Sequence, residues 1–206
     1  MRTDAEVVDL PAGTYVPAAT RLRDLDKDVL DAEQHARLGV LGRRRWLLRL
    51  DEKDCNVQVV RDLVADGETD GVNQKHLCKT RKTWYSLEKV PPPDILVGPM
   101  GKERFRVVLN AIGAVPTNTL YAVRLRRRPV EPELPKLLAD WLRSAEGQWA
   151  MASVARQHGL GVLKLEPSDL AQIPLPDWLA DRLEPSYARP SSPYTEGDAS
   201  DFQAGR

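Results

Sequence analysis

The spacing of apolar residues in the first 72 positions predicts two helices with a strand between them. Residues 31–41 have a weak helical pattern, whereas a second helix is expected from an N-cap at Asn56 to an end at Gly67. The run Trp46-Leu47-Leu48-Arg49-Leu50 predicts a buried strand. Residues 1–28 show neither the apolar spacing of a helix nor that of a strand, and they are interrupted by proline and glycine. We therefore expect an irregular N-terminal segment there.

The section from residue 75 to residue 125 changes to short apolar runs that are typical of strands. Strands are expected at residues 76–80, 83–87, 95–97, 105–110 and 119–125. Pro91, Pro92 and Pro93 must lie between strands, because a proline donates no backbone hydrogen bond to a central strand.

Helical spacing returns at residue 134. Leucines and tryptophans recur at this spacing toward Gly159, and we interpret Trp141 and Trp149 as core residues. Residues 184–206 are rich in Pro, Ser, Gly and Asp and predict a disordered C-terminal tail. These patterns together predict an α+β fold, in which a mixed or antiparallel sheet core has flanking helices.

The neutral total charge hides an uneven distribution. The 206 residues carry 30 Lys and Arg and 30 Asp and Glu, and 42% of them are apolar, as in ordinary globular proteins. The net charge is −4 in residues 1–72, +9 in residues 73–128 and −5 in residues 129–206. Aromatic residues such as Trp84 and Tyr85 are interleaved with the central cations. Clustered cations attract phosphates and aromatic rings pack on sugars or bases, so nucleic acid is the first partner to consider.

The stretch Lys79-Thr80-Arg81-Lys82-Thr83-Trp84-Tyr85 is the strongest local candidate for a binding surface. On a strand, Arg81 and Thr83 would face phosphates while Lys82 and Trp84 face the other side. A solvated edge strand with Trp84 in the core explains the same residues equally well.

Two asparagines are further candidates. The amides of Asn110 and Asn118 can make the paired hydrogen bonds that read adenine in a groove. For either residue alone we favour the alternative that it caps a turn between strands.

Signals for catalysis and metal binding are weak. His76 and Cys78 lack a second pair of zinc ligands, and Asp94 lacks the acidic-x-Lys partner of a metal-dependent nuclease. We therefore expect no catalytic residue and no metal site in this chain. The two cysteines form no disulfide framework, and neither a signal peptide nor a membrane span is visible, so we expect a cytoplasmic protein with no membrane partner.

Several short motifs occur in a characteristic order and cover about residues 14–180. They are Val16-Pro17-Ala18-Ala19-Thr20-Arg21, Arg81-Lys82-Thr83-Trp84-Tyr85, Pro92-Pro93-Asp94-Ile95-Leu96, Asn110-Ala111-Ile112-Gly113-Ala114, Thr117-Asn118-Thr119-Leu120-Tyr121 and Gly161-x-Leu163-Lys164-Leu165-Glu166-Pro167. The series resembles the C-terminal part of N6-adenine-specific DNA methyltransferases, including those fused to or paired with restriction enzymes.

In that family, this region is the target-recognition domain. It grips double-stranded DNA and reads the site while a separate catalytic domain flips out an adenine and methylates it. The resemblance implies a DNA target-recognition domain over residues 29–183. It also implies nine residues in or beneath a DNA-facing surface, namely Arg81, Lys82, Trp84, Tyr85, Arg104, Asn110, Thr117, Asn118 and Lys164.

The catalytic motifs of the resembled family are missing from this sequence. Pro91-Pro92-Pro93-Asp94 does not match the Asn/Asp-Pro-Pro-aromatic tetrapeptide, and no Gly-rich loop for S-adenosylmethionine follows a strand. We therefore expect a recognition module or fragment with no cofactor of its own, and S-adenosylmethionine in a catalytic partner. A separate subunit, a fragment of a split gene and a relic all stay open.

Two other functions remain as alternatives. One is a stand-alone S-adenosylmethionine-dependent DNA methyltransferase that acts through residues we do not recognise. The other is a scaffold that docks a partner through the helical face containing Trp141 and Trp149.

Overall fold

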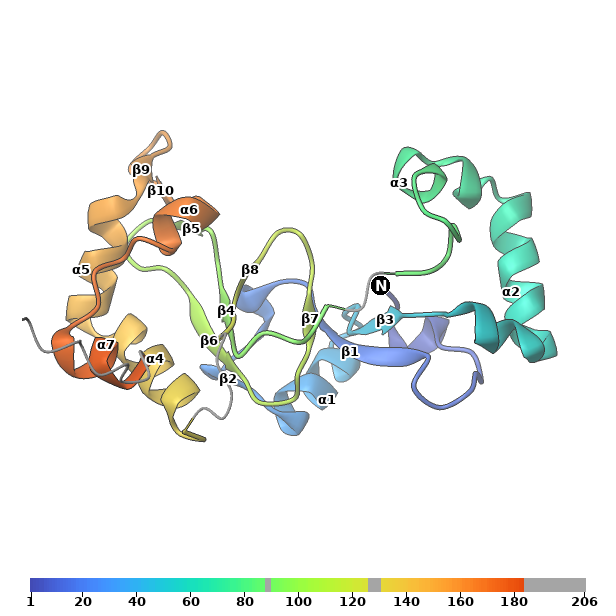
Figure 1. The fold of residues 1–206 in the computed structure, drawn as a ribbon, viewed down its shortest axis with the longest axis horizontal. Helices are drawn as coiled ribbons and strands as arrows, with labels where there is room; N and C mark the ends of the chain where they lie inside the picture. The colour runs from blue at the N-terminus through green and yellow to red at the C-terminus, as the bar shows by residue number, and fades with distance from the viewer. Residues whose placement is uncertain (88–89, 126–130, 184–206) are drawn as a thin grey trace, which may run out of the picture. The chain divides into compact units, whose positions relative to one another are not determined.

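A computed structural model of the chain describes residues 1–87, 90–125 and 131–183 (Figure 1). The chain divides into two units, Met1–Pro174 and Leu175–Arg206. Helix α7 (Asp177–Leu183) belongs to the second unit, and every element described below belongs to the first. The expected tail at residues 184–206 lies outside the described residues. None of the described helices has the length and apolar character needed to span a bilayer.

A four-stranded mixed sheet in the order β2-β6-β4-β8 forms much of the core. Its strands are β2 (Val29–Leu30), β4 (Ile95–Val97), β6 (Val107–Asn110) and β8 (Tyr121–Val123). Strand β4 is antiparallel to β6 and β8, whereas β2 runs parallel to β6. All three residues of β4 are fully buried, which explains why this strand is a continuous apolar run rather than an alternating one.

Two three-stranded sheets flank this core. The first has the order β3-β1-β7 and consists of β1 (Tyr15–Ala19), β3 (Trp46–Leu48) and β7 (Val115–Pro116). The second has the order β5-β10-β9 and consists of β5 (Met100–Gly101), β9 (Arg156–Gln157) and β10 (Leu163–Lys164). Strand β1 pairs antiparallel with β3 and parallel with β7, so the end of β1 and the residues after β7 meet.

Six helices connect these strands in the described part of the first unit. They are α1 (Ala32–Val40), α2 (Gln58–Thr69), α3 (His76–Lys79), α4 (Leu134–Arg143), α5 (Ala145–Val154) and α6 (Pro167–Leu170). Short 3-10 turns are η1 (Asp4–Glu6), η2 (Leu22–Asp24), η3 (Glu52–Asn56) and η4 (Val72–Gln74). Asp31 begins α1 as a side-chain cap, because its Oδ1 accepts a hydrogen bond from the Gln34 amide at 2.8 Å.

One apolar cluster joins β1, η2, β2, α1, β4 and β6. Its buried members are Ala19, Leu22, Leu25, Leu30, Leu38, Leu96, Val108 and Ala114. Fully burying a leucine contributes about 2 kcal/mol, so Leu22 and Leu25 hold the backbone after β1 firmly against the sheet. The cluster therefore fixes the position of the polar residues that lie between Ala19 and Leu25.

The predicted α+β class is confirmed, and several predicted strands are present in shorter form. Strands β3, β4, β6 and β8 fall within the segments expected from the sequence. The expectation of irregular structure at residues 1–28 differs from the structure, which contains β1 there. Strand β1 is short and carries Pro17, and its partners β3 and β7 come much later in the chain.

The strands predicted at residues 76–80 and 83–87 are wrong. Residues His76–Lys79 form helix α3, and residues 80–87 form turns. The sole sheet-like contact of these turns with the described part of the chain is an isolated bridge between Ser86 and Leu50. The segment instead packs on α2 through Trp84. The ring of Trp84 lies so close to Gly67 that a Cβ atom there would be 2.6 Å from the ring.

Two predicted helix boundaries are also wrong. Asn56 ends η3, the N-cap of α2 is Val57 without a side-chain bond, and α2 continues through Gly67 to Thr69. Gly67 serves the close approach of Trp84 rather than the end of the helix.

The long helical pattern after residue 134 divides into two helices at Ser144. The Ser144 backbone is extended, and its Oγ caps α5 by accepting the Gly147 amide at 3.1 Å. Trp141 is buried as predicted, but the prediction for Trp149 is wrong, because 72% of it is exposed. The change of helix direction rotates Trp149 out of the core, where Ala150 and Met151 are buried instead.

Candidate nucleic-acid interface

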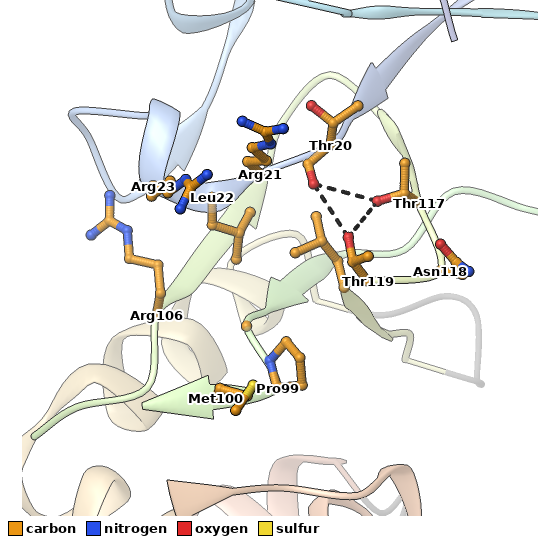
Figure 2. Close-up of a pocket in the computed structure, with 12 residues that line it drawn as sticks. Thr20, Arg21, Leu22, Arg23, Pro99, Met100, Arg106, Thr117, Asn118 and Thr119 are labelled. Carbon is orange, nitrogen blue, oxygen red and sulfur yellow. Dashed lines mark hydrogen bonds between the residues drawn. The ribbon is translucent and has the colours of Figure 1, made fainter. Parts of the chain in front are cut away.

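A cavity of about 760 Å³ opens where the end of β1 meets the loops after β4 and β7 (Figure 2). Its lining combines polar and cationic side chains with apolar ones. The lining residues are Thr20, Arg21, Leu22, Arg23, Gly98, Pro99, Met100, Arg106, Thr117, Asn118, Thr119 and Leu120. The buried cluster beneath η2 fixes the arginine side of this cavity.

Three threonines tie the loop after β7 to the end of β1. The hydroxyls of Thr117 and Thr119 hydrogen-bond to each other at 2.8 Å, so one of them donates to the other, and both lie 3.4 Å from the Thr20 carbonyl, which accepts the remaining proton (Figure 2). The Thr117 amide also donates to the Ala19 carbonyl at 3.0 Å. These bonds hold Asn118 at the cavity in an exposed position, and its side-chain amide bonds to no other described residue.

The positive charge of the cavity comes from Arg21 and Arg23. Both are exposed, and neither guanidinium bonds to a carboxylate within the described residues. Arg106 differs, because its guanidinium forms an ion pair with Asp28 and donates to the Lys27 carbonyl at 2.8 Å. Arg21 and Arg23 are therefore the cations of this cavity that are available to an external anion.

A second cavity of about 530 Å³ continues on the other side of Arg21. It shares Thr20, Arg21 and Thr117 with the first cavity and adds Arg43 and Arg44. Arg43 Nε forms an ion pair at 3.6 Å with Asp24, which also lines this cavity, whereas the exposed Arg44 guanidinium pairs with none of the described residues. Burial, followed by the positive charges of Arg44 and Arg2, lowers the pKa of the Met1 amino group, as expected in a positive local potential.

The acidic residues of the same segment do not neutralise this surface. Asp26 pairs with Arg37 at 2.7 Å, and Asp28 pairs with Arg106 and Arg143. Because these carboxylates pair with other arginines, they do not neutralise the positive charges of Arg21 and Arg23. The local charge of the cavity is therefore positive although residues 1–72 as a whole are acidic.

Of the nine residues predicted from the sequence, Thr117 and Asn118 line the cavity. Lys164 lies beside it, because Lys164 pairs across strands with Met100, which is a lining residue. Its ammonium lies 2.8 Å from Glu166. That hydrogen bond, followed by the charge of Glu166, raises the pKa of Lys164, so this lysine stays protonated at neutral pH.

Arg81, Lys82, Trp84 and Tyr85 form a separate group beside α2. Trp84 Nε1 donates to Glu68 at 3.1 Å, and its ring meets that of Tyr85 edge to face with centroids 5.6 Å apart. The Tyr85 hydroxyl lies 3.1 Å from Cys55 Sγ, and this hydrogen bond, followed by burial, raises the pKa of Tyr85 to about 12. The two rings anchor the loop, which leaves Arg81 and Lys82 exposed.

Arg104 and Asn110 lie elsewhere. Arg104 is exposed and donates to the carbonyl of Arg143 at the end of α4. Asn110 is buried, and its amide donates to Pro93 at 2.8 Å and Ala114 at 3.0 Å while accepting from the Ala114 amide at 2.8 Å. Asn110 thus closes the turn between β6 and β7, the capping role favoured from the sequence, and offers no free polar atom to a ligand.

Arg21, Arg23 and Arg44 are candidate residues that the sequence patterns did not indicate. They fall in the section whose net charge is −4, and averaging over that section concealed them. The available signals were the Arg21-Leu22-Arg23 spacing and the run Arg43-Arg44-Arg45. Neither shows that the two segments come together across β1 and β3.

Within the described residues, no group of three or more His, Cys, Asp or Glu side chains could hold a metal ion. Cys55 and Cys78 are free thiols. The described cavity residues offer guanidinium, hydroxyl and amide groups, which can bind an anionic or polar ligand.

Comparison with known proteins identifies similarity to type II methyltransferases. A family model described as the C-terminal domain of the type II methyltransferase M.Eco57I matches residues 2–194. The type II methyltransferase M.AccI of Acinetobacter calcoaceticus is 29% identical over 108 residues, which are 52% of this chain and 20% of that protein. The aligned region thus covers about a fifth of this relative's length. Because the family match extends over nearly the whole sequence, the chain belongs to the family of M.Eco57I-type methyltransferase C-terminal domains.

Proposed function

We propose that this chain recognises duplex DNA on behalf of an adenine-specific DNA methyltransferase of a restriction–modification system. The observation that carries the proposal is the cavity rimmed by Arg21 and Arg23, in a chain that belongs to a methyltransferase C-terminal domain family. Unpaired guanidinium groups favour phosphate oxygens because they offer charge and paired donors. The expected ligand is therefore double-stranded DNA, bound in the cytoplasm.

The two cavities divide the recognition task. Arg21, Arg23 and Arg44 contact the phosphate backbone and fix the position of the protein on the duplex. Asn118 lines the first cavity beside the bonded threonines, and its amide has the donor and acceptor that pair with an adenine edge. The guanidinium groups supply affinity, and Asn118 contributes to sequence preference.

Methyl transfer in this proposal belongs to a catalytic methyltransferase domain, on the same polypeptide or on a partner subunit. That domain binds S-adenosylmethionine, takes an adenine out of the duplex and methylates N6, because the exocyclic amine is shielded within the base stack. The chain described here holds the flanking duplex during this step. Arg81 and Lys82, on the loop beside α2, provide a second cationic contact with the DNA.

The test is a binding titration of the purified chain with random-sequence 30-base-pair duplex at low and moderate salt. Calorimetry with S-adenosylmethionine on the same sample accompanies it. We expect duplex binding that weakens steeply with salt and no heat from the cofactor. Cofactor binding by this chain would favour a methyltransferase acting alone, and affinity that is absent or indifferent to salt would overturn the proposal.

A further inference from the structure

The hairpin formed by β9 and β10 ends in three consecutive residues with left-handed backbone angles. Gly159, Leu160 and Gly161 have φ values of 60°, 48° and 74°. The turn is closed by the His158 amide, which donates to the Val162 carbonyl at 2.8 Å, and by the Val162 amide, which donates to Gly159 at 3.0 Å. In Figure 1 the hairpin projects beyond the end of α5.

Leu160 at this tip is unusual in two independent ways. It is 97% exposed, more than any other large apolar side chain of the described residues. It is also the sole non-glycine residue with positive φ in the part of the chain that the structure describes. Glycine would adopt this backbone without strain, so folding does not require a leucine here. Strained backbone that displays an exposed apolar side chain is typical of a residue kept for binding.

The surroundings of Leu160 fit a polyanion. The nine residues from Arg156 to Lys164 contain no acidic residue, and Arg156, Gln157 and His158 are all exposed. Arg156 does lie 3.5 Å from Asp169, and Lys164 lies 2.8 Å from Glu166. Both pairs involve partly exposed side chains, so water screens them and they can exchange for phosphate contacts.

The hairpin is connected to the candidate DNA interface through β5. Lys164 pairs with Met100 of β5, and Met100 lines the arginine-rimmed cavity. The Leu165 amide also donates to the carbonyl of Pro99, another lining residue, at 2.8 Å. The arginine-rimmed cavity and the hairpin therefore share strand β5.

We propose that Leu160 inserts as a wedge between stacked base pairs of the bound duplex. The inference rests on the proposed function, because it requires the chain to bind DNA. An apolar side chain makes no favourable contact with phosphates. Between two bases, however, it is removed from water and replaces the stacking contacts that the bases lose. The flanking cations of the hairpin hold the adjacent backbone while the leucine opens the base step.

The test uses two duplexes of 30 base pairs that differ by one central mismatch. A mismatch lowers the energy needed to open a base step, so a wedge prefers it. We expect wild type to bind the mismatched duplex about tenfold more tightly. Leu160→Gly keeps the turn, because glycine accepts positive φ, and should lose this preference while its affinity for the matched duplex changes less than about threefold. Leu77→Ala, at another exposed leucine on α3, should keep the preference.

A second readout is 2-aminopurine placed beside the mismatch, whose fluorescence rises when the base is unstacked. Wild type should raise it and Leu160→Gly should not. If wild type shows no preference for the mismatched duplex, or if Leu160→Gly keeps the preference, the wedge proposal is overturned and the proposed function is not. Duplex binding that is absent altogether overturns the proposed function as well. If Leu160→Gly instead disperses a dimer seen by sedimentation and leaves both duplex affinities unchanged, the tip is a protein contact.

Discussion

His35 and Arg45 hydrogen-bond to each other at both ring nitrogens of the histidine. His35 Nε2 lies 2.8 Å from the Arg45 carbonyl, and His35 Nδ1 lies 2.9 Å from Arg45 Nη1. A carbonyl only accepts and a guanidinium only donates, so the imidazole must be neutral with its proton on Nε2. This pair joins α1 to the start of β3, directly after Arg43 and Arg44 of the second cavity.

Stability should therefore fall as the pH drops through the range in which histidine titrates. Burial, as the largest cause, lowers the pKa of His35 below its ordinary value of 6.5. The unfolded chain then binds a proton at a higher pH than the folded chain, so the free energy of unfolding decreases from about pH 7 downward until the folded pKa is passed. Chemical denaturation between pH 8 and pH 5 measures this slope.

The matched variant for this prediction is His35→Gln. Glutamine supplies one donor and one acceptor but cannot be protonated, so its unfolding free energy should lose the pH slope between pH 7 and pH 5. His76→Gln, at an exposed histidine of α3, should retain it. An unchanged slope in His35→Gln would mean that another group dominates in this pH range.

The two asparagines should separate stability from binding. Asn110→Ala leaves the Pro93 and Ala114 carbonyls and the Ala114 amide without their partner, and should lower the free energy of unfolding by about 3 kcal/mol. Asn118→Ala, at the exposed cavity edge, should change it by less than about 0.5 kcal/mol and weaken duplex binding roughly fivefold. The reverse pattern in urea denaturation and DNA titration would contradict these roles.

The corner between α4 and α5 should tolerate no side chain at Gly147. A Cβ atom there would clash with the Trp141 carbonyl oxygen, which belongs to the rigid backbone. Gly147→Ala should therefore cost about 3 kcal/mol of stability. Glu146→Ala, on the exposed side of the same turn, should cost less than about 1 kcal/mol. Equal melting temperatures for the two variants would show that the corner relaxes.

The sequence predicted the strands of the four-stranded sheet better than it predicted the residues of the candidate site. The run Ile95–Val97 is apolar throughout because it is buried on both sides, so its pattern is strong. The strands predicted at residues 76–87 are wrong, because the structure of this segment depends on the contact between Trp84 and Gly67, which is seventeen residues earlier in the chain. A charge count could not predict that Arg21 and Arg44 lie near each other, because the pairing of β1 with β3 brings them together. It also could not show that Asp26 and Asp28 form ion pairs with other arginines.

Arg81 and Lys82 should act as an auxiliary contact. Both are exposed on the loop anchored by Trp84 and Tyr85, so the double change Arg81→Ala, Lys82→Ala should leave the melting temperature within about 2 °C. It should weaken binding to all duplex sequences by a similar factor, because phosphate contacts carry no sequence information. Competition titrations with two unrelated duplexes measure this, and a loss confined to one duplex would reassign these residues to base reading.

The salt dependence of duplex binding tests the central claim most directly. The measurement is the slope of the logarithm of the binding constant against the logarithm of salt concentration, for wild type and for the double variant Arg21→Ala, Arg23→Ala. The charge-matched control is the double variant Lys53→Ala, Lys136→Ala, because both lysines are exposed and lie outside both cavities. Each lost phosphate contact lowers the slope by about 0.9, so the arginine variant should be less steep by about 2 and the lysine control nearly unchanged. An arginine variant with the wild-type slope would show that this cavity does not bind DNA.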